Sequence, residues 1–417
     1  MRILYNLLIT ITYAFLHLVQ FFNKKMRAFV QGRKNIFNVL SKELVPLDKV
    51  IWFHCASLGE FEQGSPVMEA LRKQLPNYKI LVTFFSPSGY EIKKNTPLAD
   101  VTCYLPFDTP ANAKRFITAV NPVMAIFVKY EFWPNYLFQL NAKKIPTILI
   151  SGLFREGQPF FKWYGSLLRK SIQSIDHFFV QDSNSKNLLS TIAIEHVTVS
   201  GDTRFDRVSH QIEMNNNLDF MENFKDHSLC IVCGSTWPED EAILIDFINT
   251  SGEDVKIVIA PHNIDRMQIE SFRTKIQKTN VCFSEKEGVK LEAFDVLILD
   301  TIGLLSKVYS YANIAYVGGA MGATGLHNIL EPATFGVPII IGDEFEKFPE
   351  ARRLQQLAGL FSVNNSVELT EIMTKLLHDS SFRSKTGMIC GHFVNSNTGA
   401  TNLIASHIAS LYSDGLI

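Results

Sequence analysis

Short apolar runs alternate with amphipathic stretches along most of the chain. In the first half, the apolar runs predict buried strands at residues 50–55, 80–85, 101–105, 124–128, 147–150 and 177–180. Amphipathic patterns between them predict helices near residues 63–74, 112–120, 135–141 and 162–172. Strands and helices in regular alternation are typical of a mostly parallel sheet covered by helices on both faces.

The alternation stops at residues 200–217, a polar stretch without apolar periodicity, and then restarts. Further strands are predicted at residues 229–233, 256–260, 296–299, 314–317 and 338–341. We therefore predict an α/β protein of two Rossmann-like domains facing a cleft, with a hinge near residues 201–219. The expected division is 1–34 for an N-terminal segment, 35–205 for the first domain and 206–417 for the second.

The N-terminal segment contains an uncharged run that is much longer than the predicted strands. Residues 3–22 carry no charged side chain, a length that suffices to cross ~30 Å of hydrocarbon. Basic residues follow at once, at Lys24, Lys25, Arg27, Arg33 and Lys34. Because basic residues that flank a span tend to stay in the cytoplasm, we expect a membrane anchor with the rest of the chain on the cytoplasmic side. The alternative is an interfacial helix that lies on the inner leaflet.

Composition narrows the class of protein. The 417 residues are 47% hydrophobic and 19% charged, which is typical of a globular protein with a sizeable core. A formal net charge of −1 gives no field that would attract nucleic acid, and no feature sets an oligomeric state. Cys230 and Cys233 form a C-x-x-C, but they lie in an apolar run and are expected to pack in the core. No spacing typical of a metal site occurs.

The strongest local signal lies in the segment 318–338. A predicted strand ends in a glycine pair that includes Gly319, and a loop of small residues leads to His327 and Asn328. Glycine lets a backbone approach a phosphate or ribose, and a helix beginning near Asn328 would present N–H groups to an anion. Glu331 could then accept hydrogen bonds from two ribose hydroxyls. The alternative is a tight strand–helix turn with Asn328 as its N-cap.

Two carboxylates follow strands of the first predicted sheet. Glu60 comes after the first strand, and Glu131 comes after the fourth. Each could have a purely structural role, because the helix dipole favours acids at the start of a helix. Two strand-end acids in one sheet are harder to dismiss than either alone, because both would lie at the edge where ligands bind.

Other polar residues also fall at strand ends or between the domains. Ser235 and Thr236 could line a phosphate or sugar, and Pro261 with His262 follows the next strand. Arg204 lies in the interdomain segment, where a cation could reach a phosphate. A linker arginine is otherwise a solvated charge.

Six motifs occur in order along the chain. They are H-C-A-S-L-G-E at 54–60, E-F-W-P-N at 131–135, G-D-T-R-F-D at 201–206, G-S-T at 234–236, D-T-I-G at 300–303 and G-L-H-N-I-L-E-P-A at 325–333. Together with the N-terminal apolar segment, these motifs resemble the 3-deoxy-D-manno-octulosonic acid (Kdo) transferases of lipopolysaccharide synthesis. The resemblance covers essentially the whole chain.

The resemblance implies a GT-B glycosyltransferase that moves Kdo from CMP-Kdo to the lipid A precursor, lipid IVA, at the inner membrane. It implies that Glu60 is the general base, that Glu131 supports the transition state and that Arg204 stabilises the departing phosphate. CMP would be held by Pro261, His262, Ile302, Gly303, Leu304, Asn328, Ile329, Leu330 and Glu331. No cofactor is expected, since CMP-Kdo is a donor substrate. No metal is expected to take part, and direct attack opposite the leaving group would invert the anomeric centre.

The sequence departs from the family pattern at three places. Leu326 stands where a second glycine often precedes His-Asn, His262 stands where arginine is common, and residues 151–155 lack the N-x-R-x-S order. Three alternatives stay open: a membrane-associated GT-B glycosyltransferase of other specificity, a nucleotide-sugar 2-epimerase and an inactive membrane-bound scaffold.

Overall fold

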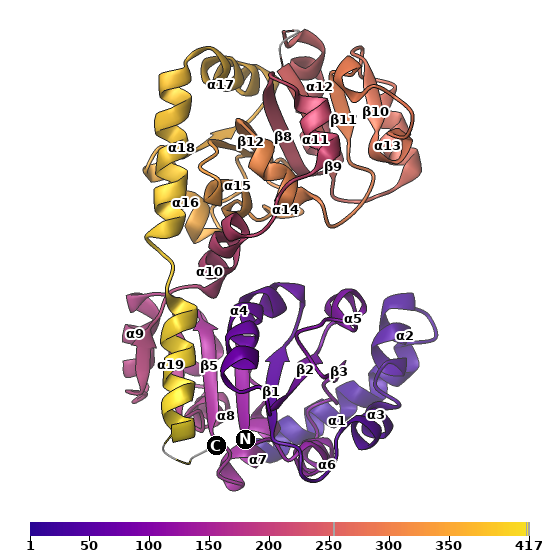
Figure 1. Ribbon diagram of the computed structural model, residues 1–417. Helices are drawn as coiled ribbons and strands as arrows, with labels where there is room; N and C mark the ends of the chain where they lie inside the picture. The colour runs from indigo at the N-terminus through magenta and orange to yellow at the C-terminus, as the bar shows by residue number, and fades with distance from the viewer. Residues whose placement is uncertain (253–254, 414, 416–417) are drawn as a thin grey trace. The chain divides into compact units, whose positions relative to one another are not determined.

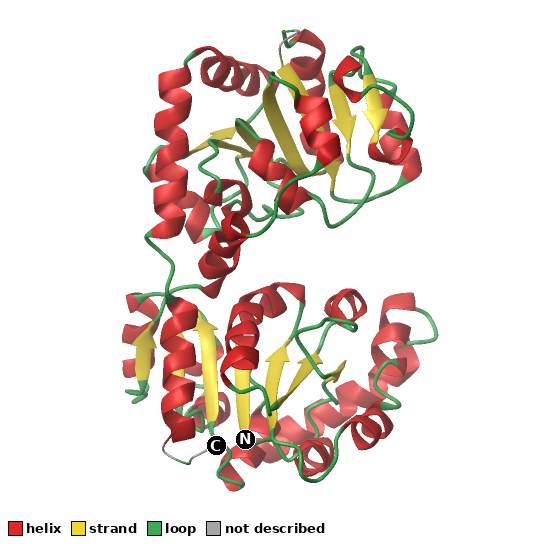
Figure 2. Ribbon diagram, viewed as in Figure 1, coloured by secondary structure: helices red, strands yellow, loops and turns green. Residues whose placement is uncertain are grey.

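The computed structural model describes residues 1–252, 255–413 and 415, and it divides into two compact units (Figure 1). The first unit comprises Met1–Arg207 and Thr398–Ile417, and the second comprises Val208–Asn397. Each unit is a parallel sheet with helices on both faces, as Figure 2 shows. The predicted pair of Rossmann-like α/β units is therefore confirmed.

The sheet of the first unit has the strand order β3-β2-β1-β4-β5-β6-β7. Its strands are β1 (Val50–Cys55), β2 (Lys79–Phe84), β3 (Val101–Tyr104), β4 (Met124–Val128), β5 (Thr147–Gly152), β6 (His177–Val180) and β7 (Val197–Val199). Around them lie α1 (Arg2–Val19), α2 (Lys24–Gln31), α3 (Ile36–Glu43), α4 (Leu58–Gln74), α5 (Pro87–Lys93), α6 (Pro110–Val120), α7 (Pro134–Ala142), α8 (Ser166–Ile172), α9 (Ser183–Ser190) and α19 (Ala400–Ser413).

The sheet of the second unit has the order β10-β11-β9-β8-β12-β13-β14. Its strands are β8 (Leu229–Thr236), β9 (Val255–Pro261), β10 (Asn280–Cys282), β11 (Val296–Ile298), β12 (Ile314–Val317), β13 (Ile339–Gly342) and β14 (Leu360–Val363). Its helices are α11 (Asp219–Lys225), α12 (Pro238–Thr250), α13 (Arg266–Arg273), α14 (Leu305–Val308), α15 (Leu330–Thr334), α16 (Pro349–Gln356), α17 (Ser366–His378) and α18 (Ser380–Asn395).

Alternate residues of each strand pack on opposite faces of the sheet. In β1, Trp52 belongs to one buried cluster, while Ile51 and Phe53 belong to the cluster on the other face. Cys230 and Cys233 are likewise buried free thiols of β8 that enter two different clusters, as expected from the apolar run. Strands buried on both faces read as continuous apolar runs, which is why the sequence pattern located them.

The C-terminal helix departs from the expected division of the chain. The second domain was expected to run to residue 417, but α19 packs on the first unit. Ile404 and Ile408 enter the cluster that lies under α4. Asp206 secures the start of α19, because its carboxylate accepts hydrogen bonds from the backbone N–H groups of Gly399 (2.6 Å) and Thr401 (2.7 Å).

The interdomain segment also differs from the expectation of a polar stretch without periodicity. Residues Thr203–His210 form α10, and a 3₁₀ turn follows at Gln211–Glu213. Phe205 and Val208 are the buried apolar side chains of α10. Two apolar positions in an otherwise polar helix are too few to produce a visible period in the sequence.

Candidate active site

Each sheet reverses its strand order at one point, and several of the predicted site residues follow the two strands that flank it. In the first sheet β1 and β4 are neighbours although two strands separate them in the sequence. In the second sheet β8 and β12 are neighbours although three strands separate them in the sequence. In parallel sheets such a switch point opens a crevice at the carboxyl ends of the strands, where ligands bind.

Glu60 follows β1 and lies in the first turn of α4. Its side chain is 7% exposed. The backbone N–H of Ser57 donates a hydrogen bond of 3.0 Å to Oε2 of Glu60, and the Ser57 hydroxyl donates to the same oxygen. This capping box starts the helix and orients the carboxylate. Glu60 therefore has the structural role of an acid at a helix start. The same hydrogen bonds also fix its side chain beside the switch point.

Glu131 follows β4, on the other side of the same switch point. Burial raises the pKa of Glu131 to about 7, and repulsion from the negative charge of Glu60 adds to the rise. The two carboxylates are thus close enough to influence each other. With a pKa of about 7, Glu131 carries a proton for part of the time near neutral pH.

A chain of buried hydrogen bonds holds the loop that carries Glu131. The indole Nε1 of Trp133 donates to Nε2 of His54 at 3.0 Å. Because an indole N–H can only donate, Nε2 of His54 is an acceptor and the ring proton sits on Nδ1. Nδ1 then donates to the Thr83 hydroxyl at 2.9 Å. Burial lowers the pKa of His54 to about 3, so this ring is neutral at physiological pH.

Arg204 lies at the start of α10 in the first unit and is turned toward Asp202. Its Nε donates to Oδ2 of Asp202 at 2.8 Å, and its terminal nitrogen Nη2 lies at the same distance. Burial opposes ionisation of Asp202, but the Arg204 charge and its hydrogen bonds outweigh this and lower the Asp202 pKa. Gln63 of α4 also donates to this carboxylate. The G-D-T-R-F-D motif thus holds Arg204 in a fixed position beside α4.

The glycines of the second unit are required by close packing of the chain. A Cβ on Gly318 would stand 2.4 Å from the carbonyl oxygen of Ser235. Gly319 has φ = +96°, and a Cβ there would stand 2.2 Å from the carbonyl oxygen of Gly325. A Cβ on Gly234 would meet the Tyr309 hydroxyl at 2.0 Å. These contacts explain the glycine pair without a ligand, and a role in binding stays a prediction.

Asp240, which the motifs did not single out, organises the loops after β8 and β12. Its Oδ2 accepts hydrogen bonds from the backbone N–H groups of Gly319 (2.8 Å) and Trp237 (2.9 Å). Its Oδ1 accepts from the Tyr316 hydroxyl at 2.8 Å. Burial raises the pKa of Asp240. The only sequence signal for this role is an acid three residues after Trp237, at a helix start.

Three aromatic rings line the second switch point. Trp237 stacks on His262 with ring centroids 4.5 Å apart, and His262 lies 4.4 Å from the ring of His327. The indole Nε1 of Trp237 donates to Nε2 of His327 at 3.0 Å. Burial, together with the neighbouring His262, lowers the pKa of His327 to about 4. These rings are therefore neutral near pH 7 and present flat surfaces.

The predicted ribose contacts lie at the start of α15. The helix begins at Leu330, two residues later than expected, and Asn328 accepts a hydrogen bond from the Leu330 N–H at 3.2 Å. The Asn328 amide donates to Oε1 of Glu331 at 3.3 Å, and the Ser306 hydroxyl of α14 donates to Oε2 at 3.1 Å. The structure thus joins Glu331 to α14, the helix that directly follows the predicted CMP contacts at residues 302–304.

The predicted CMP contacts Ile302, Gly303 and Leu304 form an open turn. Ile302 is 83% exposed, and Gly303 has φ = +91°. Ile329 and Pro261, in contrast, contribute mainly to the frame of the site. Ile329 is buried, and Pro261 ends β9 directly before His262, whose backbone N–H donates to the Thr236 carbonyl at 2.9 Å.

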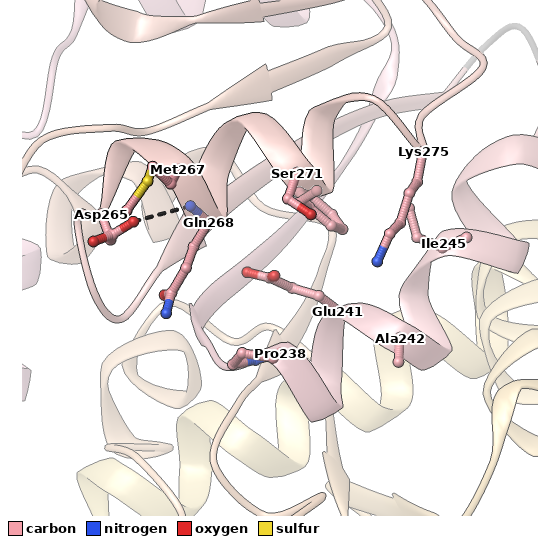
Figure 3. Close-up of a pocket in the computed structure, with 10 residues that line it drawn as sticks. Pro238, Glu241, Ala242, Ile245, Asp265, Met267, Gln268, Ser271 and Lys275 are labelled. Atoms are coloured by element: carbon pink, nitrogen blue, oxygen red, sulfur yellow. Dashed lines mark hydrogen bonds between the residues drawn. The ribbon is translucent and has the colours of Figure 1, made fainter.

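A cavity of about 520 Å³ lies in the second unit between α12 and α13. Figure 3 shows the Glu241 carboxylate and the Lys275 ammonium directed into it. Glu241 accepts a hydrogen bond from the Thr236 hydroxyl at 3.1 Å, which is the link between this cavity and the predicted site. The cavity is lined mainly by two helices rather than by strand-end loops, so its position differs from that of a switch-point site.

The first part of the chain matches a known family. Residues 28–207 match the family described as 3-deoxy-D-manno-octulosonic-acid transferase (kdotransferase). A 3-deoxy-D-manno-octulosonic acid transferase from Haemophilus influenzae is 27% identical over 367 residues, covering 85% of this chain and 85% of the relative. The enzyme of the same name from Aquifex aeolicus is 28% identical over 334 residues, covering 78% and 86%.

Solved structures resemble this chain in fold. A UDP-GlcNAc 2-epimerase from Neisseria meningitidis bound to UDP-GlcNAc has a TM-score of 0.62 and 17% identity, covering 87% of this chain and 100% of that one. At this identity the likeness shows the fold alone, and it confirms the predicted GT-B architecture. With this fold, a family match over residues 28–207 and relatives that span most of its length, the chain is similar in sequence to the Kdo transferases and in fold to GT-B proteins.

Proposed function

We propose that the chain is an inverting glycosyltransferase that moves Kdo from CMP-Kdo to the lipid A precursor lipid IVA. The similarity to Kdo transferases, over residues 28–207 and with relatives that span most of the chain, supports a role in lipopolysaccharide synthesis. The observation that supports the proposed transfer mechanism is the pair Glu60 and Glu131. They follow the two strands that flank the switch point of the first sheet, and their charges interact.

A sugar hydroxyl is a poor nucleophile near pH 7, so a positioned carboxylate has to take its proton. We assign this role to Glu60, because the capping box holds its carboxylate rigidly at the switch point. The acceptor oxygen bonds to the anomeric carbon of Kdo from the side opposite the phosphate. The bond from that carbon to the phosphate oxygen breaks, its electron pair leaves with CMP and the hydroxyl proton goes to Glu60.

Glu131 is proposed to stabilise the positive charge that develops on the sugar ring. A carboxylate with a pKa of about 7 can be ionised or protonated at working pH, so a small change in its surroundings sets its charge. Arg204 is proposed to stabilise the charge on the departing phosphate. Its pairing with Asp202 fixes its direction, as positioning of this kind requires.

The CMP moiety is proposed to bind at the second switch point, in contact with Ser235, Thr236, Gly319 and the turn 302–304. The flat, neutral rings of His262 and His327 suit a nucleobase or ribose face, and Glu331 suits two ribose hydroxyls. No metal takes part in this proposal. The protein is proposed to act at the cytoplasmic side of the inner membrane, where a lipid acceptor would be reached.

The direct test is incubation of the protein with CMP-Kdo and tetraacylated lipid A precursor, followed by mass spectrometry of the lipid. The proposal expects a lipid heavier by one or more Kdo residues, together with release of CMP. Donor that is altered without a change in the lipid mass would contradict transfer. Nuclear magnetic resonance of the new linkage reports whether the anomeric centre is inverted.

A further inference from the structure

The N-terminal helix α1 is attached to the first unit along its length. The hydroxyl of Tyr5 donates to Oδ2 of Asp108 at 2.7 Å, and the Asn135 amide donates to Oδ1 of Asn6 at 2.9 Å. One helical turn or more further on, Tyr13 stacks on Phe107 with centroids 5.1 Å apart. Figure 1 shows α1 lying against the body of the first unit.

The attached residues form one stripe. Ile9, Tyr13 and Leu16 pack against the buried cluster of Phe29, Val30 and Phe107, and they follow Tyr5 at steps of three or four residues. Such spacing places them on one side of a helix. From Tyr5 to Leu16 the helix rises about 16 Å, so more than half of α1 is in contact with the protein.

The opposite side of α1 is apolar and exposed. The residues of this outer face are at least 55% exposed: Ile3, Leu4, Leu7, Leu8, Ile11, Phe15 and Leu18. Phe21 and Phe22 extend the face beyond the helix, with exposures of 68% and 91%. An apolar patch of this size on a protein surface marks a site of association.

Exposed basic residues follow this face on its C-terminal side. Lys24, Arg27 and Lys34 are exposed on the segment that follows α1, and the first acidic residue of the chain is Glu43. Arg33, which the sequence suggested as part of the basic flank, is instead buried. It donates to the carbonyl oxygens of Leu105 (2.9 Å) and Phe29 (2.8 Å), so it serves the fold. An apolar face with exposed basic neighbours is complementary to an anionic lipid surface.

We propose that α1 lies in the plane of the membrane interface, with its outer face in lipid and its inner stripe on the first unit. A helix that crossed the bilayer would break the contacts of Tyr5 and Asn6 and carry their polar groups into hydrocarbon, where each unsatisfied group costs several kcal/mol. At 18 residues, α1 is also at the short end of the range for a span.

This geometry connects the membrane helix to the catalytic loop, an argument that rests on the proposed function. The Asp108 carboxylate that accepts from Tyr5 also accepts the backbone N–H groups of Asn135 and Tyr136, each at 3.2 Å. These residues begin α7, directly after the loop that carries Glu131. The helix in the lipid surface is therefore part of the scaffold that positions Glu131 toward a lipid acceptor.

Spin labels on single introduced cysteines test the orientation of α1. A single labelled cysteine would replace, one at a time, Leu4, Leu8, Ile11, Phe15 and Leu18. Each variant is the full chain, bound to phosphatidylethanolamine–phosphatidylglycerol vesicles. The cysteines of the chain are all buried, which leaves the introduced thiol as the reactive one. An in-plane helix gives a similar shallow depth at every position, about 5–10 Å below the headgroup boundary. A depth that is greatest at Ile11 and small at both ends would overturn the proposal.

Charge substitutions provide a second readout. Leu8→Asp and Ile11→Asp are each expected to weaken sedimentation with these vesicles about tenfold or more, because each removes apolar area from the outer face. Val367→Asp, at a 66% exposed position of α17, is the matched control and should bind as wild type does. Equal binding of all three variants would contradict the proposal. Neither readout requires turnover, so failure here is distinguishable from failure of Kdo transfer.

Discussion

The indole of Trp133 donates its N–H to Nε2 of His54 and so joins the loop after β4 to the strand β1. The same pair of side chains recurs in the second unit, where Trp237 donates to Nε2 of His327 across the β8–β12 switch point. In both units the acceptor histidine is neutral, since burial lowers the pKa of His54 to about 3 and that of His327 to about 4. Each site loop is thus fixed by a hydrogen bond that does not titrate near pH 7.

Removing the donor in the first unit should slow transfer and leave donor binding intact. Trp133→Phe keeps an aromatic ring but deletes the N–H, so His54 loses its partner and the Glu131 loop gains freedom. We expect kcat to fall roughly tenfold to a hundredfold, because small displacements of catalytic groups cost that much. Stabilisation of the variant by CMP should match that of wild type. Trp163→Phe, at a 92% exposed position, serves as control, and an unchanged kcat for Trp133→Phe would refute the positioning role.

The raised pKa of Glu131 predicts how stability depends on pH. The carboxyl has a pKa of about 7 in the folded state against 4.5 normally, so the unfolded chain releases this proton first. The free energy of unfolding therefore loses a contribution as pH rises from about 4.5 to 7 and is level above that. Glu131→Gln removes this titration. Urea unfolding at pH 5 and pH 8 should show a smaller loss in the variant, and equal losses would contradict the shifted pKa.

Asp240 is predicted to be the residue on which the loops of the second unit most depend. Asp240→Asn replaces an acceptor oxygen by an NH₂ group that faces the N–H donors of Gly319 and Trp237 or the Tyr316 hydroxyl. We expect a loss of about 1–3 kcal/mol in the free energy of unfolding, because buried donors lose their partner. Asp246→Asn, on the exposed side of α12, should change it by less than about 0.5 kcal/mol. A similar stability of both variants would contradict this assignment.

Nucleotide selectivity is checked by thermal unfolding with CMP or UDP. CMP at 100 times its Kd should stabilise the protein by about 2.7 kcal/mol, whereas UDP at the same concentration should have little effect. His262→Ala opens the stack of Trp237 and His327 and is expected to reduce the effect of CMP. The exposed His378 of α17 provides the control substitution His378→Ala. Stronger stabilisation by UDP would favour a glycosyltransferase of other specificity.

The parts that were predictable from the sequence are those with strong local patterns. The central strands were located within about two residues at most ends, because a strand buried on both faces needs a continuous apolar run. Both switch-point acids were found because they directly follow such runs. The short strands β7, β10 and β14 were missed, since three or four residues with some exposed side chains, such as Val199, give little signal.

Other features depend on contacts between residues far apart in the sequence. The pairing of α19 with α4, the burial of Arg33 against backbone carbonyls and the acceptor role of Asp240 all belong to this class. The stripe of α1 that contacts the protein is another example, because the polarity of Tyr5 and Asn6 gains its meaning only from Asp108 and Asn135. A hydrophobic segment alone is equally consistent with a span and with an interfacial helix.

The most direct test of the proposed mechanism is the initial rate of Kdo transfer by Glu60→Gln, measured together with its stabilisation by CMP. Glutamine can still accept the Ser57 N–H, so α4 should form, but the amide cannot take the acceptor proton. The account predicts a rate lower by about 10²–10⁴ and unchanged stabilisation by CMP. Glu69→Gln, at an exposed position of the same helix, should keep the wild-type rate. Wild-type turnover by Glu60→Gln would contradict the assignment of Glu60 as the general base.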